Sequence, residues 1–271
     1  MVDPAGSDAA IEARGLTRRF GELTAVDHLD LRIDAGVVYG LLGSNGAGKT
    51  TTIRMLTTLT PPSEGSARVA GFDVAHAARE VRRRIGYVPQ LVSSDGGLSG
   101  YENLLLSAKL HGIPRAEREA RIAAALDFMD LGAAARKLVR GYSGGMIRRL
   151  EVAQAMLHEP AVLFLDEPTV GLDPVARHAV WERLRELRGR FGTTILLTTH
   201  DMEEADALCD TIGLMHKGKL ATEGSPEALK QAVGPEATLD DVFVQTTGGA
   251  LAEGGNYRDV AATRRTARRL S

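Results

Sequence analysis

The sequence predicts an α/β fold with a mainly parallel sheet, because short apolar strand patterns alternate with helical patterns along the chain. Two features point to this class. A continuous apolar run at 37–42 is followed by a glycine-rich loop and a helical stretch, and a strand followed by a helix occurs again after Pro160. Continuous apolar runs of this length are typical of strands buried on both faces, as in parallel sheets.

The N-terminal part is predicted as antiparallel strands joined by turns. Residues 11–20 form the first candidate strand, and residues 29–34 alternate apolar and polar side chains as a half-buried strand does. A helix is expected over 51–60, because its apolar residues fall on one side, and Pro61 is expected to end it. Residues 63–92 are predicted to form further strands.

A helical insert is predicted between the two halves of the sheet. Ala, Leu, Arg and Glu dominate residues 98–157, with helical spacing of the apolar ones. Strand patterns return at 162–167 and 193–200, and residues 212–224 are predicted to form a hairpin. The chain is therefore expected to contain one domain over residues 10–248, whose last part, about 225–248, is a short extension.

Composition sets limits on the class of protein. The chain has 271 residues, 25% charged and 44% hydrophobic, which is ordinary for a globular protein. Its net charge of −2 gives no overall attraction to nucleic acid or anionic lipid. A single cysteine excludes an intramolecular disulfide and a cysteine-cluster zinc site. No apolar run is long enough for a membrane span and no secretory signal is visible, which favours a cytosolic location.

The two ends of the chain differ from its body. Residues 1–9 are small and polar, and residues 249–271 begin with a glycine-rich stretch, so both are predicted to be flexible. Five arginines lie in the last 14 residues, and this basic tail is expected either to be solvated or to approach anionic lipid.

The glycine-rich loop fits the phosphate-binding pattern G-x-x-x-x-G-K-[ST] between a strand and a helix. Its glycines allow backbone N–H groups to turn inward around an anion at a helix N-terminus. Lys49 is expected to bind the β- and γ-phosphates of a nucleotide, and the Thr50 hydroxyl to bind Mg²⁺. The predicted nucleotide-binding residues here are Gly43, Ser44, Asn45, Gly46, Ala47, Gly48, Lys49, Thr50 and Thr51.

Polar side chains follow three other predicted strands. Asp166 is a candidate ligand of Mg²⁺, and Glu167 a candidate general base for a water that attacks the γ-phosphate. Gln90 is expected to touch Mg²⁺ or that water, and His200 to hydrogen-bond the γ-phosphate. Taken alone, each of these residues is also typical of a solvated polar side chain at the end of a strand. Together they mark the carboxyl edge of a parallel sheet, where ligands bind.

A second candidate anion site is the signature segment, Tyr142–Met146, which precedes a helix. Ser143 at the helix N-cap leaves backbone N–H groups free to bind an anion. The same residues also fit an ordinary capped helix start.

These motifs, in this order and spacing, make residues 10–248 similar to an ATPase subunit of ABC transporters. The stretch GLLGSNGAGKTTTIRML at 40–56, LSGYENL at 98–104 and TLDDVFVQTTG at 238–248 resemble the drug and antibiotic exporter type, of the daunorubicin-resistance kind. The resemblance implies a RecA-like P-loop NTPase core with a helical subdomain, and ATP and Mg²⁺ as cofactors.

The resemblance also implies roles for further residues. Phe20 would stack on adenine, Asp173 would lie at a dimer seam, and Ser143, Gly144 and Gly145 would contact ATP held by a second copy. Met146 replaces the family's usual Gln in the signature, so the rate of hydrolysis is expected to differ while the anion-binding part stays intact.

The implied partners are a second copy, arranged head-to-tail across ATP, and integral membrane permease subunits at the cytoplasmic face of the cell membrane. A permease subunit is expected to dock near residues 90–103. No nucleic-acid partner is expected, because residues 1–249 carry a net charge of −5. The alternatives are an importer ATPase, a soluble ABC ATPase that acts on translation or DNA, and a regulator that binds nucleotide without hydrolysing it.

Overall fold

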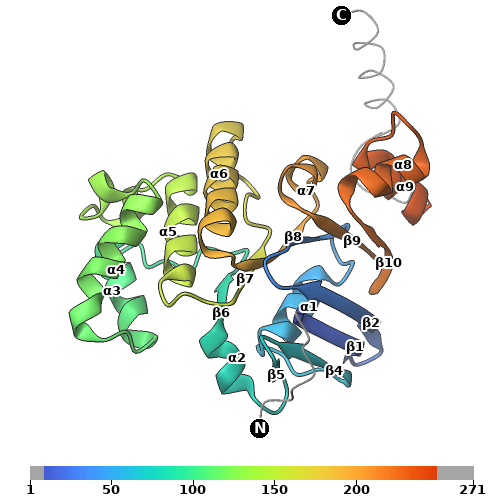
Figure 1. Cartoon of the computed structure of the whole chain (residues 1–271), viewed down its shortest axis with the longest axis horizontal. Coiled ribbons are helices and arrows are strands. Elements are labelled where there is room, and N and C mark those ends of the chain that lie inside the picture. Colours follow the sequence, from blue (N-terminus) through green and yellow to red (C-terminus); the bar gives the residue numbers. More distant parts are fainter. Residues whose placement is uncertain (1–8, 249–271) are drawn as a thin grey trace, which may run out of the picture. The chain divides into compact units, whose positions relative to one another are not determined.

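Two sheets organise the computed structural model, which describes residues 9–248 (Figure 1). The smaller sheet is antiparallel, in the order β2-β1-β4-β5. Its strands are β1 (Ala9–Phe20), β2 (Leu23–Asp34), β4 (Glu64–Val69) and β5 (Phe72–Asp73). Alternate side chains of β2, including Leu29, Leu31 and Ile33, are buried, which confirms the predicted half-buried strand.

The larger sheet has the order β10-β9-β3-β8-β7-β6 and is parallel from β9 to β6. Only β10 at its edge runs antiparallel, as the second strand of the predicted hairpin. The strands are β3 (Val38–Leu42), β6 (Ile85–Val88), β7 (Val162–Asp166), β8 (Thr194–Thr199), β9 (Thr211–His216) and β10 (Lys219–Gly224). Every residue of β3, β7 and β8 is buried, as continuous apolar runs predict.

Nine α-helices complete the described part of the chain. They are α1 (Lys49–Leu56), α2 (Ala78–Arg84), α3 (Gly100–Leu110), α4 (Arg115–Phe128), α5 (Gly144–Met156), α6 (Pro174–Phe191), α7 (Met202–Leu208), α8 (Pro226–Val233) and α9 (Leu239–Thr247). Helix α1 contacts β2 and β4 of the small sheet and β7 of the large one, so the apolar core continues from one sheet to the other.

Two predictions about local structure were wrong. Helix α1 ends at Leu56, before Pro61, because the chain turns at Thr58, whose φ is +64°. Residues 78–84, predicted as strand, form α2 instead. Only Val81 of this helix is buried and most of its other residues are charged, so it shows no apolar periodicity in the sequence.

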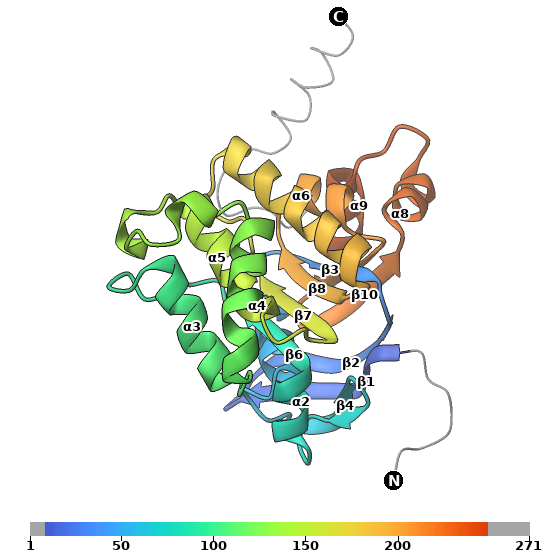
Figure 2. The same ribbon diagram turned by 60° about the vertical axis from the view of Figure 1, so that its left-hand side comes forward.

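Helices α3, α4 and α5 gather beside β6 in both views (Figures 1 and 2). Ser99 begins α3 with a capping box, in which Glu102 hydrogen-bonds back to the N-cap. Helix α5 packs on α3 and α4 on one side and on β6 and α6 on the other. Helix α5 is the last helix of the predicted insert at 98–157, and it is the one that packs on the strands of the large sheet.

The chain divides into two compact units, residues 1–226 and 227–271, and the described part of the second contains α9 and most of α8. The division falls near the predicted extension at about 225–248. Ala9, which was predicted to belong to the flexible N-terminus, lies in β1. The rest of that predicted terminus and the predicted basic tail lie outside the described residues. No helix within residues 9–248 is both long enough and apolar enough to cross a membrane.

Candidate active site

The phosphate loop, residues 43–50, joins β3 to α1 at the carboxyl edge of the large sheet. Gly48 has a φ of +107°, and a Cβ there would lie 2.6 Å from the Ala25 carbonyl oxygen. Only glycine fits this position, because the conformation is left-handed and the neighbouring backbone is close. Of the other predicted loop residues, Asn45 and Gly46 are exposed, Ala47 is buried, and Thr51 is half-buried on α1.

Lys49 holds its ammonium group inside the loop. Its side chain is 5% exposed, and Nζ donates to the carbonyl oxygens of Gly43 at 2.8 Å and Ser44 at 3.2 Å. Nζ also lies 3.4 Å from Glu167 Oε1. Burial lowers the pKa of Lys49 and the carboxylate of Glu167 opposes that shift. The cation is thus held between the phosphate loop and the end of β7.

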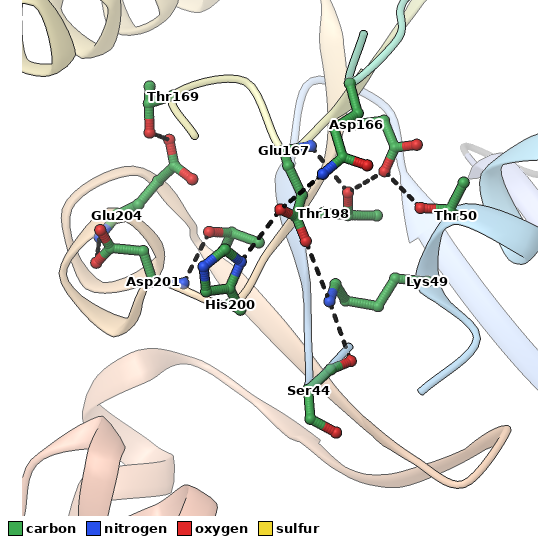
Figure 3. A network of polar contacts seen from close by, with 12 residues as sticks. Ser44, Lys49, Thr50, Asp166, Glu167, Thr169, Thr198, His200, Asp201 and Glu204 are labelled. Carbon is green, nitrogen blue, oxygen red and sulfur yellow. Dashed lines mark hydrogen bonds and ion pairs between the residues drawn. The ribbon is translucent and has the colours of Figure 1, made fainter. Parts of the chain in front are cut away.

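Thr50 and Asp166 meet at the same edge (Figure 3). Thr50 Oγ1 donates to Asp166 Oδ1 at 3.0 Å, and Thr198 Oγ1 donates to the same oxygen at 2.6 Å. A hydroxyl and a carboxylate side by side are hard oxygen donors, the type that Mg²⁺ prefers. The pair therefore fits a magnesium ion held partly by protein and partly by substrate phosphates.

Glu167 lies at the centre of the site. Its φ of +48° is in the left-handed region, which is unusual for a residue other than glycine. Its backbone N–H donates to Thr198 Oγ1 at 3.0 Å. Its Oε2 lies 3.1 Å from His200 Nδ1 and 3.4 Å from Gln90 Nε2. An amide, an imidazole and the Lys49 ammonium thus surround one carboxylate, on a side chain that is 8% exposed.

The structure therefore brings together six of the predicted site residues: Lys49, Thr50, Gln90, Asp166, Glu167 and His200. They come from β3, β6, β7 and β8 or the segments that directly follow these strands. This arrangement is the one expected at the carboxyl edge of a parallel sheet.

The remaining predicted site residues lie elsewhere in the fold. Phe20 ends β1, is 48% exposed and has the Arg18 guanidinium 4.5 Å from its ring centroid. Ser143 is the N-cap of α5, and its hydroxyl accepts from the Met146 N–H at 3.3 Å. Asp173 is the N-cap of α6. Within residues 9–248, no hydrogen bond or ion pair joins Phe20, Ser143 or Asp173 to the group around Glu167.

The signature segment and the start of α6 pack closely. A Cβ at Gly144 would lie 3.1 Å from the Leu172 side chain, and one at Gly145 would lie 2.8 Å from Ala176 Cβ. Asp173 Oδ1 in turn accepts from the Ala176 N–H at 2.9 Å. The signature segment, predicted to contact ATP of a second copy, and Asp173, predicted to lie at a dimer seam, therefore form one surface.

A buried polar cluster of Thr169, Trp181 and Glu204 lies near Glu167 and was not predicted from the sequence. Glu204 is 1% exposed and accepts a hydrogen bond from Thr169 Oγ1 at 2.6 Å (Figure 3). It also accepts one from Trp181 Nε1 at 3.0 Å. Burial raises the pKa of the Glu204 carboxyl. A small pocket of about 100 Å³ lies between this cluster and the side chains of Glu167 and His200. The partners lie 23 and 35 residues from Glu204, so no local pattern could have indicated them.

Comparison with known proteins gives consistent results. A family model described as ABC transporter matches residues 26–170. The chain is 48% identical, over 225 residues, to a daunorubicin/doxorubicin resistance ATP-binding protein of Streptomyces peucetius, a match that covers 83% of this chain and 68% of that protein. It is 46% identical, over 222 residues, to a Nod factor export ATP-binding protein of Paraburkholderia xenovorans, which covers 82% and 73%.

A solved structure of an ATP-binding subunit of an ABC transporter has the same fold. It superposes with a TM-score of 0.78 and 30% sequence identity, and the match covers 88% of this chain and 99% of that one.

Proposed function

The chain belongs to the ABC transporter family as an ATP-binding, ATP-hydrolysing subunit, and from this premise we propose that it powers an exporter. The observation that best supports hydrolysis is the position of Glu167, with Lys49, Gln90 and His200 around its carboxylate. This group lies directly beside the phosphate loop and the Thr50–Asp166 pair.

ATP binds with its phosphates in the loop at 43–50, where the backbone N–H groups and Lys49 stabilise their negative charge. Glu167 accepts a proton from the water that attacks the γ-phosphate. His200 and Gln90, which both contact the Glu167 carboxylate, orient that water and the γ-phosphate. Mg²⁺, held by Thr50 and Asp166, would neutralise charge on the β- and γ-phosphates.

The exporter needs partners that supply the transmembrane path. We place the chain at the cytoplasmic face of the cell membrane, as two copies on two permease subunits. In each copy the signature segment and Asp173 form one surface, which supports a head-to-tail dimer across ATP. The names of the relatives include daunorubicin/doxorubicin resistance and Nod factor export, so the cargo class proposed is a drug, an antibiotic or a lipid-like molecule.

The proposed base is tested by the substitution Glu167→Gln in the chain purified with its membrane subunit. We expect phosphate release to fall by about 10²–10⁴ while ATP binding persists, because the amide keeps the shape but cannot accept the proton. Glu159→Gln is the matched control, since its side chain is 71% exposed and far from these contacts. Undiminished ATP turnover in Glu167→Gln would show that another group is the base.

Export is tested with inside-out membrane vesicles that contain the chain and its membrane subunit. ATP should drive daunorubicin into these vesicles, and Glu167→Gln should abolish the uptake. Outward movement from them would indicate an importer ATPase. Strong ATPase activity that no membrane subunit or cargo changes would instead favour a soluble ABC ATPase.

A further inference from the structure

A buried ion pair on α5 takes no part in the site described above. Arg148 and Glu151 lie one turn apart and are 6% and 2% exposed. Arg148 Nη1 lies 3.1 Å from Glu151 Oε2, an oxygen that makes no hydrogen bond of good geometry. Burial of two charges is unfavourable unless their other polar atoms find partners, so the partners show what the pair holds in place.

Arg148 binds the start of the Gln90 loop, which we define as residues 89–94. Its Nη1 donates to the Pro89 carbonyl oxygen at 2.8 Å, and its Nη2 donates to the Gln90 carbonyl oxygen at 3.1 Å. The planar guanidinium thus bridges two consecutive carbonyl groups. Such a fork fixes direction as well as distance, which a lysine ammonium does not do.

Glu151 binds the other end of the Gln90 loop. Its Oε1 accepts from the backbone N–H of Ser93, from the Ser93 hydroxyl at 3.0 Å and from the Ser94 N–H at 3.3 Å. Hydrogen bonds from neutral donors to a buried carboxylate are among the stronger ones in proteins. The ion pair therefore holds the loop at two points, on either side of the exposed Leu91 and Val92.

These contacts give α5 two attachments with different roles. Its N-cap is Ser143, the residue proposed to contact ATP of the second copy, and Arg148 follows five residues later. Through the Gln90 loop, α5 also holds in place the Gln90 side chain, whose Nε2 lies 3.4 Å from Glu167 Oε2. A displacement at one attachment therefore reaches the other through one helix and five charge-assisted hydrogen bonds.

We propose that Arg148 and Glu151 are positioning residues that couple the signature segment to Gln90, so that ATP docked by a second copy holds Gln90 more firmly in its position beside Glu167. The proposal rests on the proposed function of this chain as a dimeric ATPase. It adds a route by which the signature of one chain adjusts the hydrolysis site of that same chain.

The first test compares Arg148→Gln, Arg148→Lys and Glu151→Gln in the full chain. We expect kcat for ATP hydrolysis to fall by about tenfold to a hundredfold, with KM for ATP nearly unchanged, because the phosphate loop is intact and Gln90 is misplaced. Amide hydrogen exchange over residues 88–94 should become faster. Arg148→Lys keeps the charge that pairs with Glu151, so it should fold and show a smaller effect.

Arg149→Gln is the matched control on the same helix. Its guanidinium binds the Met129 carbonyl oxygen and lies near Asp130, away from the Gln90 loop. It should leave kcat and the exchange of residues 88–94 unchanged. If the three test variants only lower the melting temperature, with wild-type kcat and wild-type exchange at 88–94, the pair is merely structural and the proposal is overturned.

The coupling itself is tested with a mixed dimer. A ¹⁵N-labelled Lys49→Ala chain, which cannot bind ATP in its own loop, is mixed with an unlabelled Glu167→Gln chain that holds ATP. Docking of that ATP on the labelled signature should slow exchange at 88–94 of the labelled chain. Adding Arg148→Gln to the labelled chain should remove the slowing, and adding Arg149→Gln should not.

The outcomes separate this proposal from the proposed function. If the two chains do not associate with each other when ATP is present, as measured by light scattering, the dimer and hence the proposed function are contradicted. If the chains do associate with each other when ATP is present, but exchange at 88–94 slows by the same amount with and without Arg148→Gln, the coupling alone is overturned.

Discussion

At the residue scale, the site depends on side chains that are far apart in sequence. Asp166 and Glu167 follow a visible apolar strand, and the phosphate loop is a contiguous pattern, so both were predictable. Thr198 was not, although its hydroxyl donates to Asp166 and accepts from the Glu167 N–H. Its side chain matters only because β7 and β8 pair in parallel, a register that no local pattern fixes.

Glu204 supports a prediction about stability. Glu204→Ala leaves the Thr169 hydroxyl and the Trp181 indole N–H buried without their acceptor, which should cost about 3 kcal/mol or more. Glu204→Gln keeps a carbonyl acceptor and removes the carboxyl whose pKa burial raises, so its cost should be below about 1 kcal/mol. Urea unfolding at pH 7 measures both.

The neighbouring Glu203 provides the control for this comparison. Its side chain is 70% exposed, so Glu203→Ala should change the free energy of unfolding by no more than about 0.5 kcal/mol. If Glu204→Ala and Glu204→Gln lower the free energy of unfolding equally, the hydrogen-bond acceptor at position 204 is not what stabilises the cluster.

At the scale of elements, the contact between α5 and α6 explains a glycine in the signature segment. A Cβ at Gly145 would lie 2.8 Å from Ala176 Cβ on α6, so Gly145→Ala should push the helices apart. Overpacking of this kind costs about 1–3 kcal/mol. Gly141→Ala is the control, because a Cβ there meets nothing within 4 Å. Equal melting temperatures for the two variants would contradict the close packing.

Three elements also meet at a pair of stacked imidazoles. The rings of His111, which follows α3, and His158, which follows α5, stack with centroids 3.8 Å apart. His158 Nε2 donates to the Ile85 carbonyl oxygen of β6 at 2.9 Å. Burial lowers the pKa of His158 from 6.5 to about 4, and the nearby His111 adds to the effect. The folded protein thus favours the neutral ring.

A pH dependence follows with a definite sign. The folded state binds a proton on His158 more weakly than the unfolded chain does. The contribution of His158 to the free energy of unfolding is therefore complete above pH 6.5 and is lost as the pH falls toward 4. At pH 5 the loss from His158 should be about 2 kcal/mol relative to pH 7. Denaturant unfolding should show a smaller pH 7 to pH 5 difference for His158→Gln than for the wild type.

Elements were predictable where their apolar residues are regular. The strands β3, β7 and β8 contain the apolar runs VYGLL, VLFL and ILL, and the sequence indicates each of them. Helix α2 buries only Val81, and its boundaries are set by packing against β5 and β6. Surface elements of this kind give no periodic signal, and tertiary contacts decide their structure.

At the scale of the whole molecule, each chain carries one phosphate loop and one signature segment, and no hydrogen bond or ion pair joins Ser143 to Lys49 among the described residues. A head-to-tail dimer would combine the loop of one copy with the signature of the other. Two inactive variants should then restore each other. Lys49→Ala disables both sites of its homodimer, and Ser143→Arg does the same through the signature.

In the mixed dimer one site joins an intact loop to an intact signature, while the other site carries both substitutions. Random exchange makes half of the dimers mixed, each with one intact site of two, so turnover per chain should recover to about one quarter of the wild-type value. Phosphate release, measured before and after mixing with the membrane subunit present, checks this. If each variant stays inactive after exchange that mass spectrometry confirms, the site uses the loop and signature of one chain, and the head-to-tail arrangement is wrong.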